Sequence, residues 1–263
     1  SSTSTLLILE TAGSPYILDH DFHVLPGGFI LISDGVDLQV DNGARIIGDG
    51  GAISATSSGL GPAVVRARVG GNASSWGGFV LQNGSELTIR HARILEADGA
   101  VTMLGIATLD AQFAEFVGCG MWCVATNDTA TVTLRDSLMS GGLWGLIERG
   151  AADILVDNLT LSNFTGGGLW FQKASVGAAV SRISASNVSV GIRTDLLRAS
   201  VIGPLTITST GASVSGAGSS DLAIHNATLT STGGAAFEQS FTARLTLRDS
   251  RLNGATRAVS LDE

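Results

Sequence analysis

The chain has 263 residues, of which 44% are hydrophobic, and a formal net charge of -8 at pH 7. This acidic balance disfavours nucleic acid and anionic membranes as partners. The longest apolar runs fall far short of the roughly 20 residues that cross a bilayer, so we expect no membrane span. No charged segment precedes an apolar stretch at the N-terminus, which predicts a secreted protein whose signal peptide has been removed.

A repeat of about 23 residues runs along the whole sequence. Its clearest copies are LTIRHARI at 87–94, VTLRDSLM at 132–139, ILVDNLTL at 154–161, LAIHNATL at 222–229 and LTLRDSRL at 245–252. Apolar and polar residues alternate in each copy, as in a strand with one buried face. The apolar anchors that mark the copies are Val40, Val65, Ile89, Leu109, Leu134, Val156, Val180, Ile202, Ile224 and Leu247.

Each copy turns sharply just after its anchor. The residues at this bend include Asp136, Asn158, Pro204, Asn226 and Asp249. Asp and Asn tolerate the left-handed conformation that a tight corner needs, and proline can be accommodated there. Three short strands per repeat and no helical period predict an all-β, right-handed parallel β-helix of about ten coils, forming a single domain over residues 1–263.

The segment SPYILDHDFHVLPGGFILISDGVDLQVDNGARIIGDG, residues 14–50, carries a Tyr-x-Leu-x-x-Asp strand followed by a Gly-rich apolar ladder. It resembles the opening of the parallel β-helix families typified by NosD and by the carbohydrate-binding and sugar-hydrolase repeat domains. The resemblance implies the fold. Such repeats serve lyases, hydrolases, adhesins and surface-layer proteins alike, so the function has to be argued from the residues.

Catalytic patterns are missing from the sequence. Glycoside hydrolysis on this fold needs clustered aspartates, but there is no Asp-Asp pair, and Asn127-Asp128-Thr129 only scrambles the Asn-Thr-Asp pattern of polygalacturonases. Lys173 is the only lysine, which narrows the choice of a lyase base to arginine. The four histidines flank strands or occupy bends without metal-ligand spacing. We therefore expect no catalytic residue, no metal site and no cofactor.

Three tryptophans recur at the start of consecutive third strands. The aligned segments are Gly120-Met121-Trp122, Gly142-Leu143-Trp144 and Gly168-Leu169-Trp170, with Val101 before them and Arg193 after them in the same register. If Met121, Leu143 and Leu169 point into the core, the tryptophans and Arg193 form an exposed face that binds a sugar or another protein. A register shifted by one residue would instead bury all three rings.

Cys119 and Cys123 lie four residues apart in GCGMWCV. Three interpretations stay open at this point. The residues are buried free thiols, or an internal disulfide across a corner made by Gly118 and Gly120, or a cross-link to a neighbouring chain.

Asparagine is concentrated in glycosylation sequons. The asparagines in Asn-x-Ser/Thr motifs are Asn72, Asn83, Asn127, Asn158, Asn163, Asn187 and Asn226. A bend asparagine followed by an outward threonine produces the motif without any glycan, as at Asn158 and Asn226. The remaining excess favours a secreted, N-glycosylated surface protein.

Neither end of the predicted solenoid carries a closing helix or polar cap, and uncovered strand edges recruit further strands. We therefore predict a structural protein, similar to archaeal surface-layer or sheath subunits, that assembles with copies of itself into a cell-surface sheath, filament or layer. Its contacts would be head-to-tail through the ends and lateral through the tryptophan face and cysteines. The alternative is an extracellular polysaccharide-binding or polysaccharide-degrading module, and a third option is an adhesin or phage fibre fragment.

Overall fold

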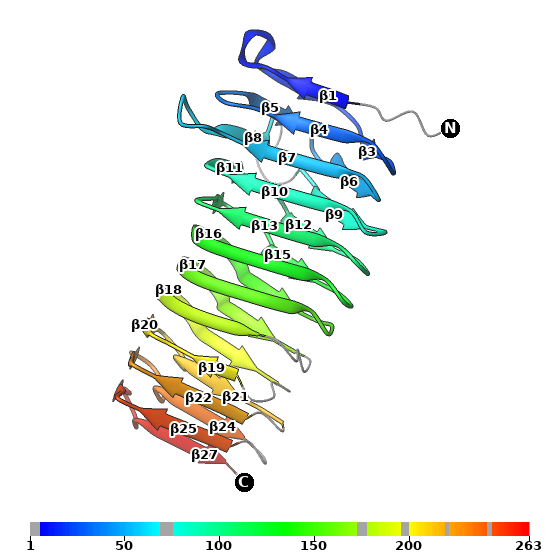
Figure 1. The fold of residues 1–263 in the computed structure, drawn as a ribbon. Coiled ribbons are helices and arrows are strands. Elements are labelled where there is room, and N and C mark those ends of the chain that lie inside the picture. The colour runs from blue at the N-terminus through cyan, green and yellow to red at the C-terminus, as the bar shows by residue number, and fades with distance from the viewer. Residues whose placement is uncertain are drawn as a thin grey trace.

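The computed structural model is an elongated stack of parallel coils with the two ends of the chain at opposite ends of the stack (Figure 1). It describes residues 6–68, 76–172, 178–195, 200–218, 221–240 and 244–262. The stack has about ten turns of about 23 residues each. Apart from the short 3-10 turn η1 (Thr11–Gly13), the regular elements of this part of the chain are strands. The predicted parallel β-helix is confirmed.

Three faces run along the stack, and each is a ladder of parallel strands from successive coils. The first face contains β1 (Leu6–Leu9), β4 (Phe29–Ile32), β7 (Ala52–Thr56), β10 (Glu86–Arg90), β13 (Thr108–Gln112), β19 (Ser200–Ile202), β22 (Asp221–His225) and β25 (Arg244–Arg248). The second face contains β2 (Tyr16–Leu18), β5 (Asp37–Val40), β8 (Ala63–Ala67), β11 (Ala92–Leu95), β14 (Glu115–Val117), β20 (Leu205–Ser209), β23 (Ala227–Ser231) and β26 (Arg251–Asn253).

The third face contains β3 (Phe22–Val24), β6 (Arg45–Asp49), β9 (Gly78–Gln82), β12 (Gly99–Met103), β15 (Trp122–Thr126), β21 (Val214–Gly216), β24 (Phe237–Ser240) and β27 (Val259–Asp262). Three long strands in the middle of the stack pass through all three faces without a break. They are β16 (Thr131–Glu148), β17 (Asp153–Phe171) and β18 (Ala179–Thr194).

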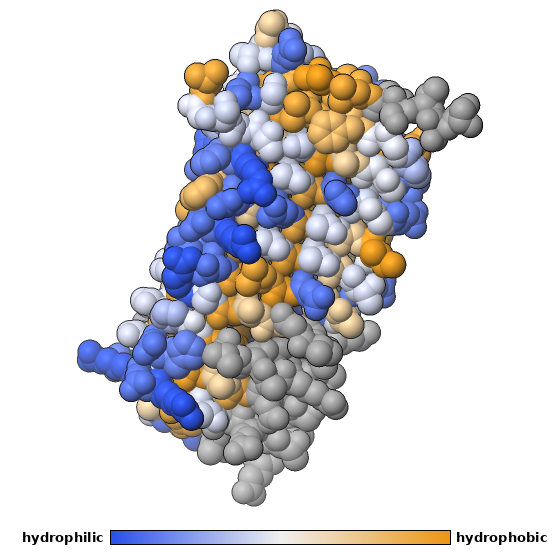
Figure 2. All heavy atoms as spheres, in the orientation of Figure 1, coloured by the Kyte–Doolittle hydropathy of each residue, from blue (hydrophilic) through white to orange (hydrophobic). Residues whose placement is uncertain are grey.

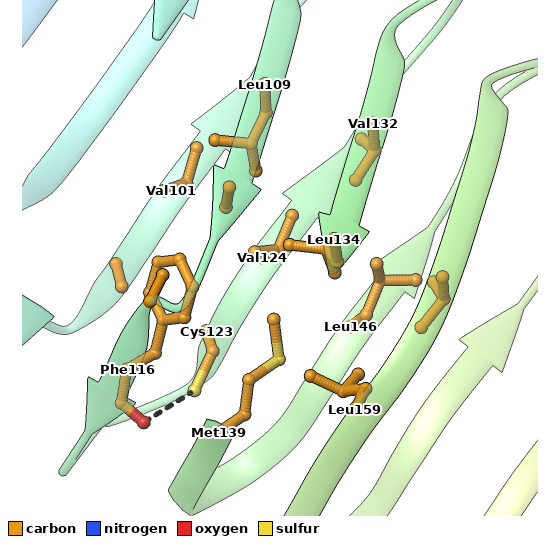
Figure 3. Packing of buried hydrophobic residues seen from close by; sticks show 14 of the residues in the cluster. Val101, Leu109, Phe116, Cys123, Val124, Val132, Leu134, Met139, Leu146 and Leu159 are labelled. Carbon is orange, nitrogen blue, oxygen red and sulfur yellow. Dashed lines mark hydrogen bonds between the residues drawn. The ribbon is translucent and has the colours of Figure 1, made fainter. Parts of the chain in front are cut away.

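Inward side chains from the three faces fill one continuous core (Figure 3). One column on the first face consists of Ile32, Ala55, Ile89, Ala111, Leu134, Val156, Val180, Ile202 and Ile224, each at most 2% exposed. This column confirms the anchors Ile89, Leu134, Val156, Val180, Ile202 and Ile224, and Leu247 pairs with Ile224 at its end.

Three of the predicted anchors are wrong. Leu109 precedes the column residue of its coil, Ala111, by two positions. Val40 and Val65 are buried, but they belong to the second face. The coil that starts at Ala52 is longer than the others, because Ala52 pairs with Glu86, and this insertion hides the correct alignment in the sequence.

The first corner joins the first face to the second and has the left-handed conformation expected from its sequence. Its residues with φ between 49° and 56° are His91, Phe113, Asp136, Asn158, Arg182, Asn226 and Asp249. The expectations for Asp136, Asn158, Asn226 and Asp249 are confirmed. In the coil of β19 and β20, Gly203 and Pro204 form this corner and are joined by a cis peptide.

The second corner joins the second face to the third and is also left-handed. Its residues with positive φ include Glu96, Gly118, Gly141, Asn163 and Asn187. The Asn187 Nδ2 donates to Asn163 Oδ1 of the preceding coil at 2.7 Å, and Asn163 Nδ2 donates to Ser140 Oγ at 3.2 Å. These amide contacts connect neighbouring coils outside the backbone ladder.

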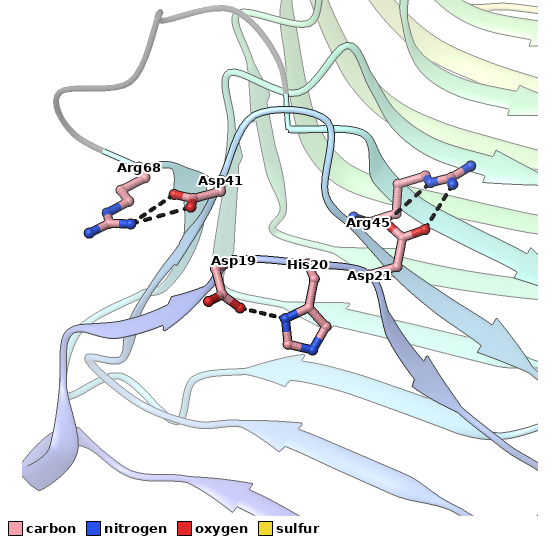
Figure 4. A network of polar contacts seen from close by, with 6 residues as sticks. All are labelled: Asp19, His20, Asp21, Asp41, Arg45 and Arg68. Carbon is pink, nitrogen blue, oxygen red and sulfur yellow. Dashed lines mark hydrogen bonds and ion pairs between the residues drawn. The ribbon is translucent and has the colours of Figure 1, made fainter.

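Ion pairs also join neighbouring coils on the outside of the stack. Those of the N-terminal coils are Arg45 with Asp21, Arg68 with Asp41 (Figure 4) and Arg66 with Asp37, and further along lie Arg93 with Glu115 and Arg182 with Asp157. Hydrophilic residues gather over β8 and β11 in Figure 2. Exposed pairs of this kind contribute about 0–1 kcal/mol each, so the ladder and the core remain the main sources of stability.

The carboxyl group of Asp157 makes the stability of the fold depend on pH in the acidic range. Hydrogen bonds from Arg182 and then from Ser181 lower its pKa from 3.8 to about 2. The folded state therefore gains stability above about pH 4, and this gain is lost as the pH falls from about 4 to about 2. We expect the thermal midpoint to fall across this window. Asp157→Asn should lower the midpoint at neutral pH and reduce the fall.

The matched control is Asp249→Asn, which changes an exposed corner carboxyl elsewhere in the stack. Its profile of thermal midpoint against pH, measured by circular dichroism, should run parallel to the wild-type profile. An Asp157→Asn profile that is also parallel to wild type between pH 4 and pH 2 would contradict the assignment.

Candidate functional site

The three tryptophans singled out in the sequence are neighbours in the structure. Trp122 at the start of β15 pairs with Trp144 of β16. The rings of Trp144 and Trp170 lie 4.8 Å apart between centroids, tilted by 35°. Trp122 and Trp170 are half-buried, whereas Trp144 is only 7% exposed. The prediction of one exposed tryptophan column is therefore wrong for Trp144.

The residue before each tryptophan was expected to point into the core, and this holds for only one of the three copies. Leu169 is fully buried, as predicted. Met121 and Leu143 were expected in the core, but they are 43% and 42% exposed. Met121 directly precedes β15, and Leu143 lies within β16 at the register irregularity between Gly142 and Trp144, so the alternation of inward and outward residues does not hold at either position.

The alignment of Trp170 with the other two tryptophans is also wrong. A register shift between β16 and β17 at Gly142 and Trp144 pairs Trp144 with Gly167, and Trp170 pairs with Ile147 instead. Val101 does not share the register of Trp122 either, since it pairs with Val124. Bulges insert a residue into a strand without leaving a clear mark in the sequence, which explains the error.

Two arginines pack on these rings. The guanidinium of Arg193, which pairs with Trp170 as predicted, lies 4.6 Å from that ring's centroid, and the guanidinium of Arg149 lies 5.0 Å from the Trp122 ring. Asp195 accepts hydrogen bonds from Trp170 Nε1 at 2.9 Å and from Arg193 Nε at 3.1 Å. Cation–π contacts of this kind stabilise by about 0.5–1 kcal/mol when exposed.

We call Trp122, Trp144, Trp170, Arg149 and Arg193 the tryptophan–arginine cluster. Sequence reasoning missed Arg149, and it missed the role of Asp195. Both residues follow the ends of third-face strands, where no periodic pattern marks them. Their contacts arise because neighbouring coils bring these ends together.

Glycines make room for the indole rings. A Cβ on Gly99 would lie 2.4 Å from Trp122 Nε1, and one on Gly167 would lie 2.5 Å from Trp144 Cζ3. Trp122 Nε1 also donates to Thr102 Oγ1 of the preceding coil at 3.1 Å. The rings are therefore held against neighbouring coils, with much of their faces in internal contacts, while Met121 and Leu143 remain exposed.

Cys119 and Cys123 form an internal disulfide, with 5.4 Å between their Cα atoms. Both residues are buried, and Cys123 lies beside Phe116 in the core (Figure 3). Of the three interpretations of the sequence, the structure supports the internal bridge. The bridge encloses Met121 and Trp122, so it constrains the backbone that carries part of the cluster.

Most of the sequon asparagines sit in left-handed corners. Asn83, Asn158, Asn163, Asn187 and Asn226 all have φ between 51° and 61°. The Nδ2 groups of Asn83 and Asn158 donate to Asp49 and Asp136 of earlier coils, in addition to the two amide contacts of the second corner. Asn127 directly precedes the left-handed Asp128, and Asn72 lies outside the described residues. Corner geometry thus accounts for five of the seven asparagines, and N-glycosylation stays a prediction.

A shallow hollow at the first corner was not predicted. It has a volume of about 280 Å³ and is lined by Ser57, Gly59, Gly61, Pro62, His91, Ala92, Arg93, Phe113 and Glu115. The rings of His91 and Phe113 stack with 4.6 Å between centroids and an interplanar angle of 14°. Beside them Arg93 Nε donates to Glu115 Oε2 at 2.7 Å.

Phe113 is unusual because it is a bulky residue with φ at 51° and is 46% exposed. Four other copies fill this corner with Asp or Asn and one with Arg, so the fold does not require an aromatic ring here. A second hollow of about 320 Å³ lies on the following coils, and Phe113 and Glu115 line both hollows. Sequence reasoning placed His91 at a bend but did not consider Phe113, and the signal that could have found the pair is that Phe113 follows Gln112 in the same way as His91 follows Arg90 in the paired strand.

The loop that forms one wall of the first hollow is held by Asp34. Ser58 donates to Asp34 through its backbone N–H at 2.6 Å and through its hydroxyl at 2.9 Å, and the Ser57 hydroxyl also donates to this carboxylate. These hydrogen bonds, led by that of Ser57, lower the pKa of Asp34 to about 2.

Within the described ranges, no group of three or more His, Cys, Asp or Glu side chains is arranged to hold a metal ion. The same part of the chain has no helix of the length and hydropathy that would cross a bilayer.

No protein-family model matches the chain, and no curated protein or solved structure shows significant similarity to it.

Gly99 tests how closely the cluster is packed. Gly99→Ala should displace the Trp122 ring, changing the tryptophan emission spectrum and lowering the free energy of unfolding by about 1–3 kcal/mol. Gly216→Ala is the matched control, since its Cβ would meet nothing closer than 3.7 Å. An unchanged spectrum and unchanged stability in Gly99→Ala would show that Trp122 does not lie across this glycine.

Proposed function

We propose that the protein is a secreted structural solenoid that assembles with copies of itself at the cell surface. The observation that carries this proposal is the exposure of Met121 and Leu143 beside the tryptophan–arginine cluster. These two large apolar side chains lie on adjacent coils, and each directly precedes a tryptophan of the cluster. Trp, Met and Arg are the residue types enriched at protein interfaces, where a few of them supply most of the binding energy.

The surface is also rigid before any partner binds. The parallel ladder fixes its backbone, the Cys119–Cys123 bridge encloses two of its residues, and stacking holds its rings. A preorganised surface loses little conformational entropy on association, which favours a specific and repeated contact. A lateral contact of this type suits an assembly of many identical rods.

End-to-end stacking is the second contact of the proposal. In the described residues β1 pairs with β4 on one side, and Leu6 and Ile8 of β1 are 61% and 44% exposed. Apolar side chains gather at this end of the stack in Figure 2. A strand of a second copy added to this edge would cover them and continue the ladder.

The lateral contact is tested by the double substitution Met121→Ser and Leu143→Ser. Sedimentation velocity and negative-stain electron microscopy at rising concentration should show ordered oligomers for the wild type, and smaller species for the double variant. Because both side chains are exposed, the fold should persist, as checked by circular dichroism.

Leu60→Ser is the matched control for this test, because Leu60 is 90% exposed on a distant loop. It should assemble like the wild type. A wild-type chain that remains monomeric at every concentration would refute the proposal, and oligomers that survive the double substitution would refute the lateral contact.

Polysaccharide binding is a second candidate, and the first-corner hollow is the observation that favours it. Here the exposed Phe113 ring lies beside the Arg93–Glu115 pair, which offers both hydrogen-bond donors and acceptors for sugar hydroxyl groups. The rings of the tryptophan–arginine cluster suit this role less well, because much of their face area is in contact with neighbouring coils. For a sugar ligand we therefore favour the hollow at Phe113 over the tryptophan face that was predicted from the sequence.

Phe113→Asn separates the two candidates. Asparagine tolerates the left-handed corner, so the variant should fold and gain stability by about 1 kcal/mol while losing the aromatic ring. Isothermal titration with soluble cello- and chito-oligosaccharides should show binding to the wild type and not to Phe113→Asn, with Asp249→Asn binding like the wild type. Absence of binding to the wild type, or binding that is unchanged in Phe113→Asn, would reject this site.

A further inference from the structure

Hydroxyl side chains occupy a block of the second face in the C-terminal half of the stack. The outward residues there are Thr160 and Ser162 of β17, Ser184 and Ser186 of β18, Thr206 and Thr208 of β20, and Thr228 and Thr230 of β23. All of them are exposed or half-exposed. We call these residues the hydroxyl lattice.

The choice of residues is specific to this block. On the same face in earlier coils, the corresponding outward positions hold charged and apolar residues, as in β11 and β14 with Arg93, Leu95, Glu115 and Val117. In the same coils on the third face, they hold Trp170, Arg193, Ser215 and Glu238. A general richness in Ser and Thr therefore does not explain the lattice. Strand propensity favours the five threonines but does not explain the three serines, since serine is not among the residues favoured in strands.

The parallel register arranges these hydroxyl groups in rows. Thr160 pairs with Ser184, Ser184 with Thr206 and Thr206 with Thr228. In the second row Ser162 pairs with Ser186, and Thr208 with Thr230, while a register shift after Ala185 separates these two pairs. Neighbours within a row are about 4.8 Å apart, and the two rows are about 6.6 Å apart, as strand geometry requires.

Most hydroxyl groups of the lattice are available for hydrogen bonds to a ligand. Ser162 Oγ donates to Ser140 Oγ at 3.0 Å. In the part of the chain that the structure describes, the hydroxyl groups of the other seven residues make no side-chain hydrogen bond within the protein. Each can donate one hydrogen bond and accept two, and each threonine adds a methyl group to the surface.

A polar hollow borders the lattice at the second corner. It has a volume of about 330 Å³, and its lining includes Asn163, Thr165, Asn187, Ser189 and Thr210. Amide and hydroxyl groups of this kind hold ordered water. The lattice and the hollow together form a surface that is suited to organising water rather than to receiving an aromatic or charged ligand.

We propose that the hydroxyl lattice binds the surface of ice. Oxygen atoms on the growth planes of ice form rows with repeats of the same order as the spacings of the lattice. Each hydroxyl group can take the place of a lattice water, while the threonine methyl groups lie between water molecules. The backbone ladder fixes the spacing before binding, so little ordering is required. This surface lies on another face from the apolar surface used for assembly, and the inference does not depend on that proposal.

The test is the growth of a single ice crystal in a solution of the purified chain, observed under a cold-stage microscope. The wild type should produce faceted crystals and a measurable gap between melting and freezing temperatures. Thr206→Lys places a long charged side chain in the middle of the lattice and should abolish this gap. Ser215→Lys, at an outward position on the third face of the same region, should keep it.

Thermal unfolding followed by circular dichroism establishes that both variants are folded at the temperature of the assay. Ice that grows in the wild-type solution as it does in an equal concentration of serum albumin would overturn the proposal. A gap of wild-type size in Thr206→Lys would also overturn it, because the binding surface would then lie elsewhere.

Discussion

The parallel register between coils is the constraint on which the rest of this structure depends. It places each residue directly beside its counterparts in the coils before and after, about 4.8 Å away. A residue type repeated at one position therefore becomes a continuous column. Apolar columns make the core, asparagines at the second corner make an amide ladder, and opposite charges become ion pairs between coils.

The same register makes single departures from the repeat conspicuous. Gly99 and Gly167 leave space for Trp122 and Trp144, and the rings would collide with any side chain there. Phe113 stands in a left-handed corner that four other coils fill with Asp or Asn, and this conformation is unfavourable for a bulky residue. Departures that the fold does not require are the best guide to function in a molecule whose stability comes from repetition.

The proposed surfaces occupy different parts of the rod. Met121 and Leu143 lie where the second corner leads into the third face, Phe113 lies at the first corner, and the hydroxyl lattice covers the second face further along the stack. A stiff solenoid can present several such surfaces because each coil contacts only its neighbours. Association of rods through one surface therefore leaves the others in fixed positions.

The sequence alone determined the period, the alternation of inward and outward residues within strands and the first corner, because these depend on local alternation and on residues such as Asp136 and Asn158 that favour one backbone conformation. It identified Trp122, Trp144, Trp170 and Arg193 as a group. Tertiary structure decided which of these are exposed, because the bulge at Gly142 and Trp144 changes the register without a local signal. It also decided the Cys119–Cys123 bridge, the faces of Val40 and Val65, and the hollow at Phe113. Each of these depends on which residues of neighbouring coils meet. The number of residues between two positions does not specify this when a coil contains an insertion or a bulge.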